Sequence, residues 1–258
     1  MVARIYAKQG WRDQNVAFIR DVRTTIRGQT LLDTQTGKLR CRVLDLAGEE
    51  PSPVWEAYSA LLSDPRRLLL VESDLGTYAK ALANLMRMSE KDRPQLIRHD
   101  AYALASALNH GTTTGDQPKE PLIGVLSLDL VNYAGAAWWT QEGARVFSCI
   151  VRPAVAQFGA CSVVLNHTLD GRMGFTDTLH RFSDHMGCLR KALSNYARRD
   201  VPIQRLIPSD AEMKAAVTDL DFVGPLGAVQ IYRSRLMRMA TIRVSFSAND
   251  FHIWKELP

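Results

Sequence analysis

The 258-residue chain has few of the features that mark specialised protein classes. No uninterrupted apolar run approaches the ~18 residues that a membrane-spanning helix needs. The amino-terminal stretch MVARIYAKQGWRDQ has no apolar signal-peptide core, so we expect a cytoplasmic protein without membrane association. With 46% hydrophobic and 23% charged residues, 16 Gly and 11 Pro, the composition excludes disordered, collagen-like and disulfide-scaffold proteins.

Cysteine and histidine are too scattered to predict a metal site. The four cysteines are spaced too widely for a C-x-x-C motif, and the three histidines within residues 167–185 lack the H-E-x-x-H pattern. We therefore expect no metal centre, and free thiols that are mostly buried. The cysteines are Cys41, Cys149, Cys161 and Cys188.

Basic residues are concentrated in the first part of the chain. Residues 1–42 hold nine basic and three acidic side chains, a net charge of +6, whereas the whole chain carries +5.

A helix is predicted over residues 13–27, because apolar residues recur there at helical spacing and Gly28 follows at the usual capping position. Arg20, Arg23 and Arg27 share the opposite face. That face is either a solvated surface or a binding surface for a polyanionic partner. The apolar residues are Val16, Ile19, Val22 and Ile26.

From residue 39 onward, apolar strands alternate with helices. This alternation predicts right-handed βαβ crossovers and a parallel sheet that is covered on both sides. Two last β-rich runs are separated by so few residues that they form a hairpin. The predicted strands span residues 39–45, 67–72, 95–99, 122–129, 160–166, 227–233 and 239–246. The predicted helices span residues 53–63 (with Ser52 as its cap), 78–88, 101–108, 138–158, 176–198 and 211–220.

The first four of these strands end in an acidic residue or are directly followed by one. Ligands of such sheets bind beyond the carboxyl ends of the strands. Several carboxylates at that edge repel one another unless hydrogen-bond donors or a cation meet them, which makes this edge the predicted ligand site. The four acids are Asp45, Glu72, Asp100 and Asp129.

This constellation resembles the class I S-adenosylmethionine-dependent methyltransferases, whose sheet has seven strands, the last of them antiparallel through a hairpin. The resemblance covers residues 39–258, about four fifths of the chain. It implies an α/β, Rossmann-like fold with a mostly parallel seven-stranded sheet, helices on both faces and a C-terminal antiparallel hairpin. Residues 1–38 would then be a basic helical extension.

The resemblance implies S-adenosylmethionine as the cofactor. Glu72 falls where the family has an acid that accepts both ribose hydroxyls, a role suited to a carboxylate because it can accept two O–H bonds at once. Asp100 matches the acid near the adenine amino group, and the loop after Asp45 matches the family's first motif. The cofactor-binding positions implied in this way are Asp45, Ala47, Gly48, Glu72, Ser73, Asp100, Ala101 and Asp129.

At the fourth strand, the family holds the methyl donor against its acceptor. Methyl transfer from a sulfonium is an in-line displacement, so much of the catalysis is alignment, and a base is needed only where the acceptor loses a proton. We expect Asp129 to orient or deprotonate the acceptor. Asn132 and Tyr133 would supply hydrogen bonds and a stacking face.

The first motif departs from the family pattern because it is poor in glycine. Gly48 is its one glycine, with Ala47 and Glu49 at the other small positions, and Glu49 would repel the carboxylate of the cofactor unless the loop turns it away. Two alternatives stay open: a catalytically inactive binding module with this fold, and a methyltransferase of small molecules. A nicotinamide-binding domain is disfavoured, because no G-x-G-x-x-G follows the first strand.

The distribution of arginine favours a phosphate-bearing acceptor, either a nucleic acid or a nucleotide. Phosphate contacts provide affinity without reading sequence, so the acceptor class stays open at this point. Besides Arg20, Arg23 and Arg27, the basic residues considered are Arg40, Arg42, Arg190, Lys191, Arg198, Arg199, Arg233, Arg235, Arg238 and Arg243.

Changing Arg20, Arg23 and Arg27 together to Gln tests whether their face binds phosphates. We expect weaker binding of nucleic acid and a flatter dependence of log affinity on log salt, by about 0.7–0.9 for each lost phosphate contact. A salt titration of the parent and the triple variant measures both. A parent that binds no nucleic acid would contradict this expectation, and equal slopes would show a solvated face.

Overall fold

The computed structural model describes most of the first half of the chain and parts of the second. The described residues are 15–20, 28–110, 121–130, 141–168, 225–226, 229–234, 237–247 and 251–253. The chain divides into two compact units. One contains residues 1–128, 149–163 and 245–248, and the other contains residues 129–148, 164–244 and 249–258.

The strands form one sheet with a mostly parallel first half. Strand β1 pairs in parallel with β2 and β4, and β2 pairs in parallel with β3. Strand β8 pairs antiparallel with β7, and β7 with β6. The order of hydrogen-bonded neighbours is β3-β2-β1-β4-β5-β8-β7-β6, with β9 on β8. The strands are β1 (Arg42–Leu46), β2 (Leu68–Glu72), β3 (Gln95–Arg98), β4 (Ile123–Leu130), β5 (Cys161–Thr168), β6 (Pro225–Leu226), β7 (Val229–Ser234), β8 (Met237–Phe246) and β9 (Phe251–Ile253).

This architecture confirms the α/β fold class with a C-terminal antiparallel hairpin. The predicted count of seven strands is wrong, since the described part of the chain forms nine. The two additional strands, β6 and β9, have two and three residues, which is too short to show a period-2 pattern in a sequence. The helices predicted over residues 176–198 and 211–220 lie outside the described residues.

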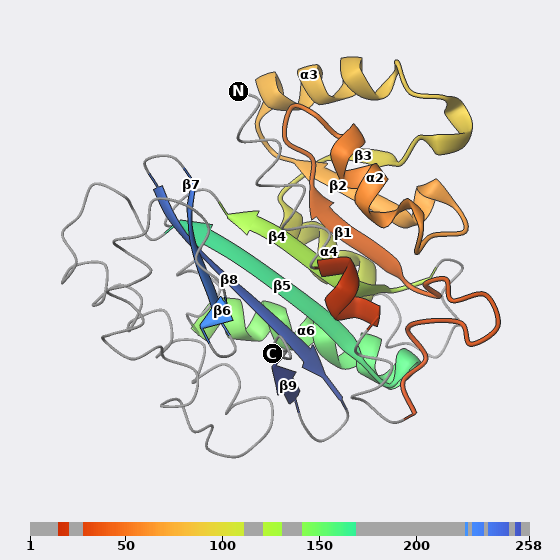
Figure 1. Ribbon diagram of the computed structural model, residues 1–258, viewed down its shortest axis with the longest axis vertical. Coiled ribbons are helices and arrows are strands. Elements are labelled where there is room, and N and C mark those ends of the chain that lie inside the picture. The colour runs from red at the N-terminus through yellow and green to blue at the C-terminus, as the bar shows by residue number, and fades with distance from the viewer. Residues whose placement is uncertain are drawn as a thin grey trace. The chain divides into compact units, whose positions relative to one another are not determined.

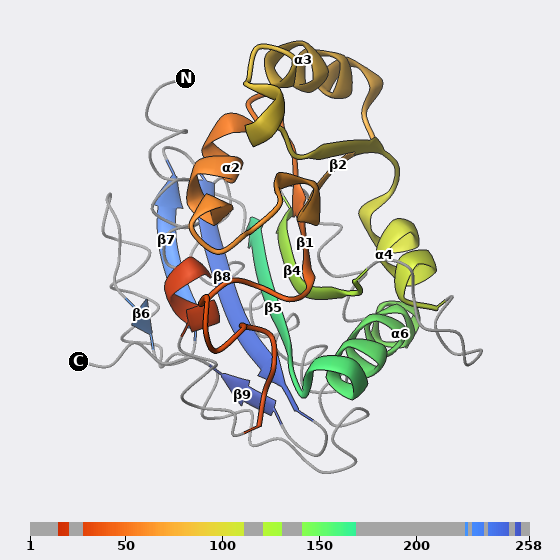
Figure 2. The ribbon, with the colours of Figure 1, turned by 90° about the vertical axis from the view of Figure 1, so that its right-hand side faces the viewer.

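Helices lie on both sides of the first unit's strands. Figure 2 shows α2 on one side of β1 and β4, and α4 and α6 on the other. None of the helices that the structure describes is long and apolar enough to cross a membrane. The helices are α2 (Ser52–Ser59), α3 (Leu75–Leu85), α4 (Ala101–His110) and α6 (Gln141–Phe158), with the short 3₁₀ helices η1 (Pro65–Arg67) and η2 (Glu90–Asp92).

Two element starts differ from the sequence prediction. Strand β1 begins at Arg42 rather than at residue 39, because Leu39 instead donates its N–H to Leu61 O and forms an isolated bridge with Leu32. Ser52 is not the cap of α2 but its first helical residue. The cap is Pro51, whose carbonyl accepts the N–H of Val54 at 3.1 Å.

Helix α3 begins three residues earlier than its apolar pattern predicts, because Asp74 caps it. The Asp74 carboxylate accepts the N–H of Thr77 at 2.7 Å. This backbone hydrogen bond is the main cause that holds the pKa of Asp74 below its ordinary value. An acidic cap also faces the positive end of the helix dipole, so the charge and the hydrogen bond both stabilise this helix end.

The part of the amino-terminal segment that the structure describes packs within the first unit. Residues 15–20 are helical, with Val16 and Ile19 buried and Arg20 exposed, as the sequence pattern predicted. Asn15 donates to the hydroxyl of Ser127 in β4 at 3.5 Å, and Thr30 N donates to Phe158 O at 2.6 Å. The division into an extension of residues 1–38 and a domain of residues 39–258 stays a prediction.

Buried Asn109 joins three elements of the core. Its side-chain amide donates to Ile123 O at 3.1 Å and to Ile150 O at 3.0 Å, and its carbonyl accepts Ile123 N at 3.1 Å. Because Asn109 ends up fully buried, these bonds replace those it would make with water. They fix the end of α4 against β4 and α6.

The region around Gly124 is packed without spare room. Cys41 and Cys161 are buried free thiols, as predicted, and burial raises the pKa of Cys41 to about 12. Gly124 of β4 lies against Cys41 so closely that a β-carbon there would be 2.7 Å from Cys41 Cβ and 2.9 Å from Leu31 Cδ2. Glycine at 124 is therefore required by this close approach.

The Gly124→Ala variant tests that packing. We expect a loss of about 1–3 kcal/mol in the free energy of unfolding, the usual cost of overpacking a core. The matched control is Gly76→Ala, since among the described residues a β-carbon there meets Asp74 Oδ1 alone, at 3.4 Å. The control should be neutral or slightly stabilising, because alanine favours a helix by up to ~1 kcal/mol over glycine. Urea unfolding measures both, and equal stabilities would contradict the predicted clash.

Candidate functional site

The strand order reverses between β1 and β4, which places the candidate site at their carboxyl ends. The chain runs outward from β1 to β2 and β3, and then returns to the other side of β1 as β4. Ligands of doubly wound sheets bind in the crevice outside such a switch point. The described residues of the first unit at this edge are Asp45 and the loop 47–49 after β1, and Glu72 at the end of β2.

Asp45 is the penultimate residue of β1 and is fully buried. One of its carboxylate oxygens accepts the N–H of the next residue, Leu46, at 2.7 Å. A buried carboxylate is costly unless hydrogen bonds replace its hydration. Asp45 therefore belongs to the structure of the turn that leaves the strand, a role compatible with the first motif to which it was assigned.

The loop after β1 turns sharply at Gly48. Ala47 is buried and donates its N–H to Val71 O of β2 at 3.0 Å. Gly48 then has a φ of 58°, in the left-handed region. Among the described residues other than its chain neighbours, none has a heavy atom within 4 Å of where a β-carbon would lie, so glycine serves the backbone conformation rather than the available space.

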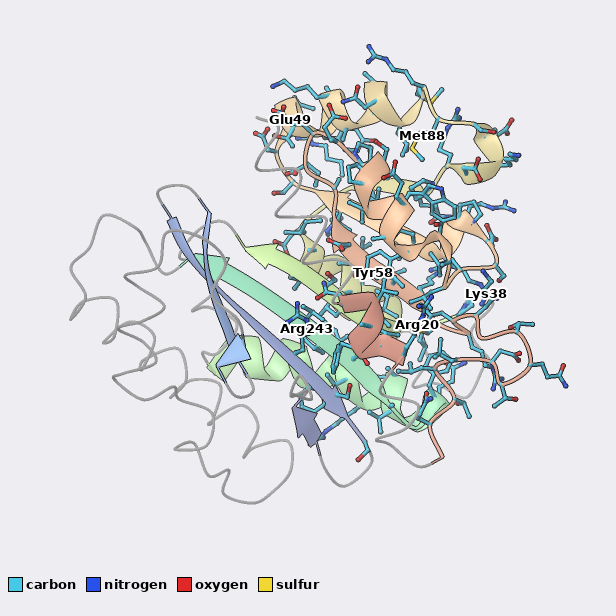
Figure 3. All side chains as sticks on the ribbon, viewed as in Figure 1. Arg20, Lys38, Glu49, Tyr58, Met88 and Arg243 are labelled. Atoms are coloured by element: carbon cyan, nitrogen blue, oxygen red, sulfur yellow. The ribbon has the colours of Figure 1, made fainter. Side chains whose placement is uncertain are left out.

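Glu49 is held by helix α3. Its carboxylate lies 2.7 Å from Lys80 Nζ, and its carbonyl accepts the side-chain amide of Asn84 at 2.9 Å. The hydrogen bond to Glu49 raises the pKa of Lys80 above its ordinary value. Lys80 and Asn84 are one helical turn apart and so hold the loop from the same side of α3. Figure 3 shows Glu49 beside α3. We call these three residues the α3 clamp.

Glu72 ends β2 with an ordered carboxylate. Its Oε1 accepts the N–H of Asp74 at 2.9 Å, and its carbonyl accepts the N–H of His99 at 3.2 Å. Among the described residues, Oε2 of Glu72 has no hydrogen-bond partner. Ser73, the next residue, is exposed. The strand end thus presents one carboxylate oxygen, oriented by the bond to the other, which can accept donors from a ligand.

Asp100 has a structural role that the sequence reasoning did not assign. It follows β3 by two residues, and its carboxylate accepts the N–H of Ala103 at 2.9 Å at the start of α4. It therefore caps α4 as Asp74 caps α3. Ala101, the first residue of α4, is buried. Contact of either residue with an adenine ring stays a prediction.

The proposed acceptor side of the site is described only in part. Asp129 lies in β4, but its side chain is outside the described part of the structure, as are Asn132 and Tyr133. Ser127, two residues before Asp129, is buried and receives the hydrogen bond from Asn15. Their assignment to catalysis stays a prediction. No group of three His, Cys, Asp or Glu side chains in the described ranges could hold a metal ion.

Two of the arginines considered for phosphate binding are buried. Arg42 and Arg243 have 7% and 2% of their surface exposed, so they offer little charge to a partner. Burial, together with the nearby Arg67, lowers the pKa of Arg42. Arg42 is buried because β1 lies between β2 and β4, which no local pattern in the sequence reveals. Arg20 and Arg40 are exposed, whereas Arg23 and Arg27 lie outside the described residues.

The α3 clamp was also missed by the sequence reasoning. Lys80 and Asn84 are 31 and 35 residues from Glu49, and neither belongs to a recognisable motif. Only their spacing of four residues on a predicted helix hinted that they act together.

Comparisons with known proteins assign no family to this chain. No family model matches, and no curated protein matches. The solved structures that it resembles include the precorrin-8W decarboxylase of Methanobacterium thermoautotrophicum, at 13% identity, a TM-score of 0.37 and coverage of 87% of this chain and 88% of the other. A DUF574 family protein of Streptomyces avermitilis has 13% identity, a TM-score of 0.38 and coverage of 92% and 82%.

A third solved structure comes from Methanococcus maripaludis and is a protein provisionally named an S-adenosyl-L-methionine-dependent methyltransferase. It has 13% identity, a TM-score of 0.33 and coverage of 93% of this chain and 89% of the other. These likenesses are too distant to carry function from those proteins to this one. The fold class rests on the strand order and pairing described above.

Proposed function

We propose that this chain is an S-adenosylmethionine-dependent methyltransferase that binds its cofactor at the carboxyl ends of β1 and β2. The observation that carries the proposal is Glu72, an oriented carboxylate with one available oxygen at the end of β2, next to the switch point. When bound, the cofactor supplies a methyl group activated by a sulfonium. The chain's own residues bind it, orient it and position the acceptor.

Glu72 fits a ribose-binding role. Vicinal hydroxyls are donors, and an ionised carboxylate accepts two such bonds from one ligand. Its Oε1 is fixed by Asp74 N, so little side-chain entropy remains to be lost when a ligand binds. A carboxylate at the end of the second strand is also the usual partner of ribose hydroxyls in dinucleotide-binding folds.

The loop 47–49 fits the amino-acid end of the cofactor despite its single glycine. The left-handed Gly48 makes the turn that brings backbone to the edge of β1. The carboxylate of Glu49, which would repel that of the ligand, is paired with Lys80. The α3 clamp thus reduces the repulsion between Glu49 and the ligand carboxylate that a glycine-poor motif would otherwise cause.

The acceptor in this proposal bears phosphate groups and is a nucleic acid or a nucleotide. The basic excess of residues 1–42 supports it, and Arg20 and Arg40 are exposed members of that group. Asp129 would orient or deprotonate the acceptor, with Asn132 and Tyr133 beside it. Arg42 is left out of the proposed surface, since it is buried.

The Glu72→Gln variant tests cofactor binding. Glutamine keeps an acceptor for Asp74 N but replaces the second oxygen with an amide donor, which faces the ribose hydroxyls unfavourably. We expect S-adenosylhomocysteine to bind more weakly by about 1.5–3 kcal/mol, the value of a hydrogen bond to a charged group. Titration calorimetry of the parent and the variant measures this.

The matched control for this experiment is Glu56→Gln, which makes the same change of charge at an exposed position on α2. Its affinity should equal that of the parent. A parent that binds no S-adenosylhomocysteine would overturn the proposed function. Binding without methyl transfer to any acceptor would identify an inactive binding module instead.

The Lys80→Gln variant tests the α3 clamp. It leaves the charge of Glu49 without its partner, so we expect S-adenosylhomocysteine to bind several-fold more weakly. Binding of 5′-methylthioadenosine, which lacks the carboxylate, should not change. The double variant Lys80→Gln/Glu49→Gln should restore the affinity, because the repelling charge is gone. An equal loss for both ligands would instead indicate a general disturbance of the loop.

A further inference from the structure

Helix α3 carries a stripe of exposed apolar side chains. The exposed large hydrophobic residues among those described are Leu75 at 58%, Leu82 at 40% and Met86 at 59%, and all three belong to α3 or its C-cap. Leu82 follows Leu75 by seven residues and Met86 follows Leu82 by four, so the three side chains lie on one face of the helix. Ala79 and Ala83, also exposed, lie between them. We call these five residues the α3 stripe.

The other faces of α3 are already occupied. Ala81 and Leu85 are buried beneath the helix, which packs on β2 and β3. Lys80 and Asn84 point to the loop after β1, where they hold Glu49. At 100° per residue, the five residues of the stripe are centred about 115° from Lys80, on the opposite flank of the helix. The stripe therefore faces the outer side of the sheet, beyond β3.

The strand beneath that flank has an open edge. Within the described part of the sheet, β3 has a hydrogen-bonded neighbour on one side alone, β2. Gln95, Leu96 and Ile97 of β3 are half-buried. Figure 1 shows β3 at the end of the sheet, with α3 next to it. An open edge of this kind can pair with another strand unless charge or proline blocks it, and β3 carries a single charge, on Arg98.

We propose that α3 and β3 form a two-fold interface between two copies of this chain. Strand β3 pairs antiparallel with the same strand of the partner subunit, and the two α3 helices pack antiparallel on one face of the continuous sheet. This goes beyond the proposed function and does not depend on it.

The spacing of sheet and helix layers fits this arrangement. Neighbouring strands lie about 4.8 Å apart, so a two-fold axis between the two β3 strands is about 2.4 Å from each of them. Because α3 packs on both β2 and β3, it lies about 5 Å from that axis. The two α3 helices are then about 10 Å apart, at the upper end of the 8–10 Å range of packed helices.

The α3 stripe is complementary to itself in the antiparallel orientation. A two-fold axis between residues 80 and 81 places Leu75 opposite Met86 of the partner subunit, and Ala79 opposite Leu82 of the partner subunit. Ala79 makes room for the leucine that faces it in each copy, which allows close packing. No charged residue belongs to the stripe.

The α3 stripe alone is too small for a stable interface, so the open edge of β3 must also be buried. Stable interfaces bury about 800 Å² per partner, which three half-exposed side chains cannot reach. Main-chain pairing of β3 adds hydrogen bonds and covers Leu96 and Ile97. A pairing centred between these two residues places Gln95 opposite Arg98 of the partner subunit, so that no like charges meet.

Sedimentation equilibrium of the full chain tests the interface. We expect the parent at tens of micromolar to have twice the 28.9 kDa mass of one chain. Leu82→Lys and Met86→Lys should each shift the mass to that of one chain, because a charge in the stripe faces the other copy. The control Gln157→Lys, at an exposed position on α6, should remain dimeric. Far-UV circular dichroism should match the parent in all three variants, since each substituted side chain is at least partly exposed in the single chain.

Hydrogen exchange distinguishes this interface from another dimer. The amides of residues 95–98 that face away from β2 should exchange at least tenfold faster in Leu82→Lys than in the parent, because strand pairing is lost. A monomeric parent would overturn the proposal. A parent dimer that persists in both stripe variants, or that leaves the exchange of β3 unchanged, would overturn it as well.

Discussion

The parallel pairing of β1 with β2 and β4 is the interaction on which the first unit depends. Val43 of β1 lies opposite Leu68 of β2 and Val125 of β4, and all three are fully buried. A strand that is covered on both faces and hydrogen-bonded on both edges has little contact with water along its length. Polar side chains are therefore favoured only near its ends. The acids and loops of the candidate site are gathered at the carboxyl ends for this reason.

Helix α3 connects the candidate site to the outer edge of the sheet. Its cap, Asp74, is also the residue whose N–H orients Glu72, so the start of the helix and the carboxylate at the strand end are fixed together. One flank holds Glu49 through Lys80 and Asn84, and the other carries the apolar stripe. Successive residues of a helix point in directions about 100° apart, so one helix presents different residues to different surfaces. Helix α3 thus contributes to both the candidate site and the outer edge of the sheet.

The sequence determined which segments form strands and helices more reliably than it determined the residues at which they begin. Apolar runs predicted β2, β3, β4 and β5 within two residues, since burial on both faces selects continuous runs of such residues. Element starts were less accurate, because Leu39 and Pro51 are governed by bonds to Leu61 and Val54 rather than by periodicity. The acids were found because each stands at or just after the end of a predicted apolar strand, whereas the capping roles of Asp74 and Asp100 needed the structure.

Tertiary structure alone decided which polar residues meet. Lys80 reaches Glu49 across 31 residues, Asn109 bonds both Ile123 and Ile150, and Asn15 meets Ser127. It also decided that Arg42 and Arg243, which the sequence analysis counted among the arginines for phosphate binding, are buried. Local sequence determines which face of a strand or helix is apolar, because that depends on periodicity along one segment. Which charge or amide faces that segment depends on chain crossovers that bring distant residues together, and no single segment of the sequence contains that information.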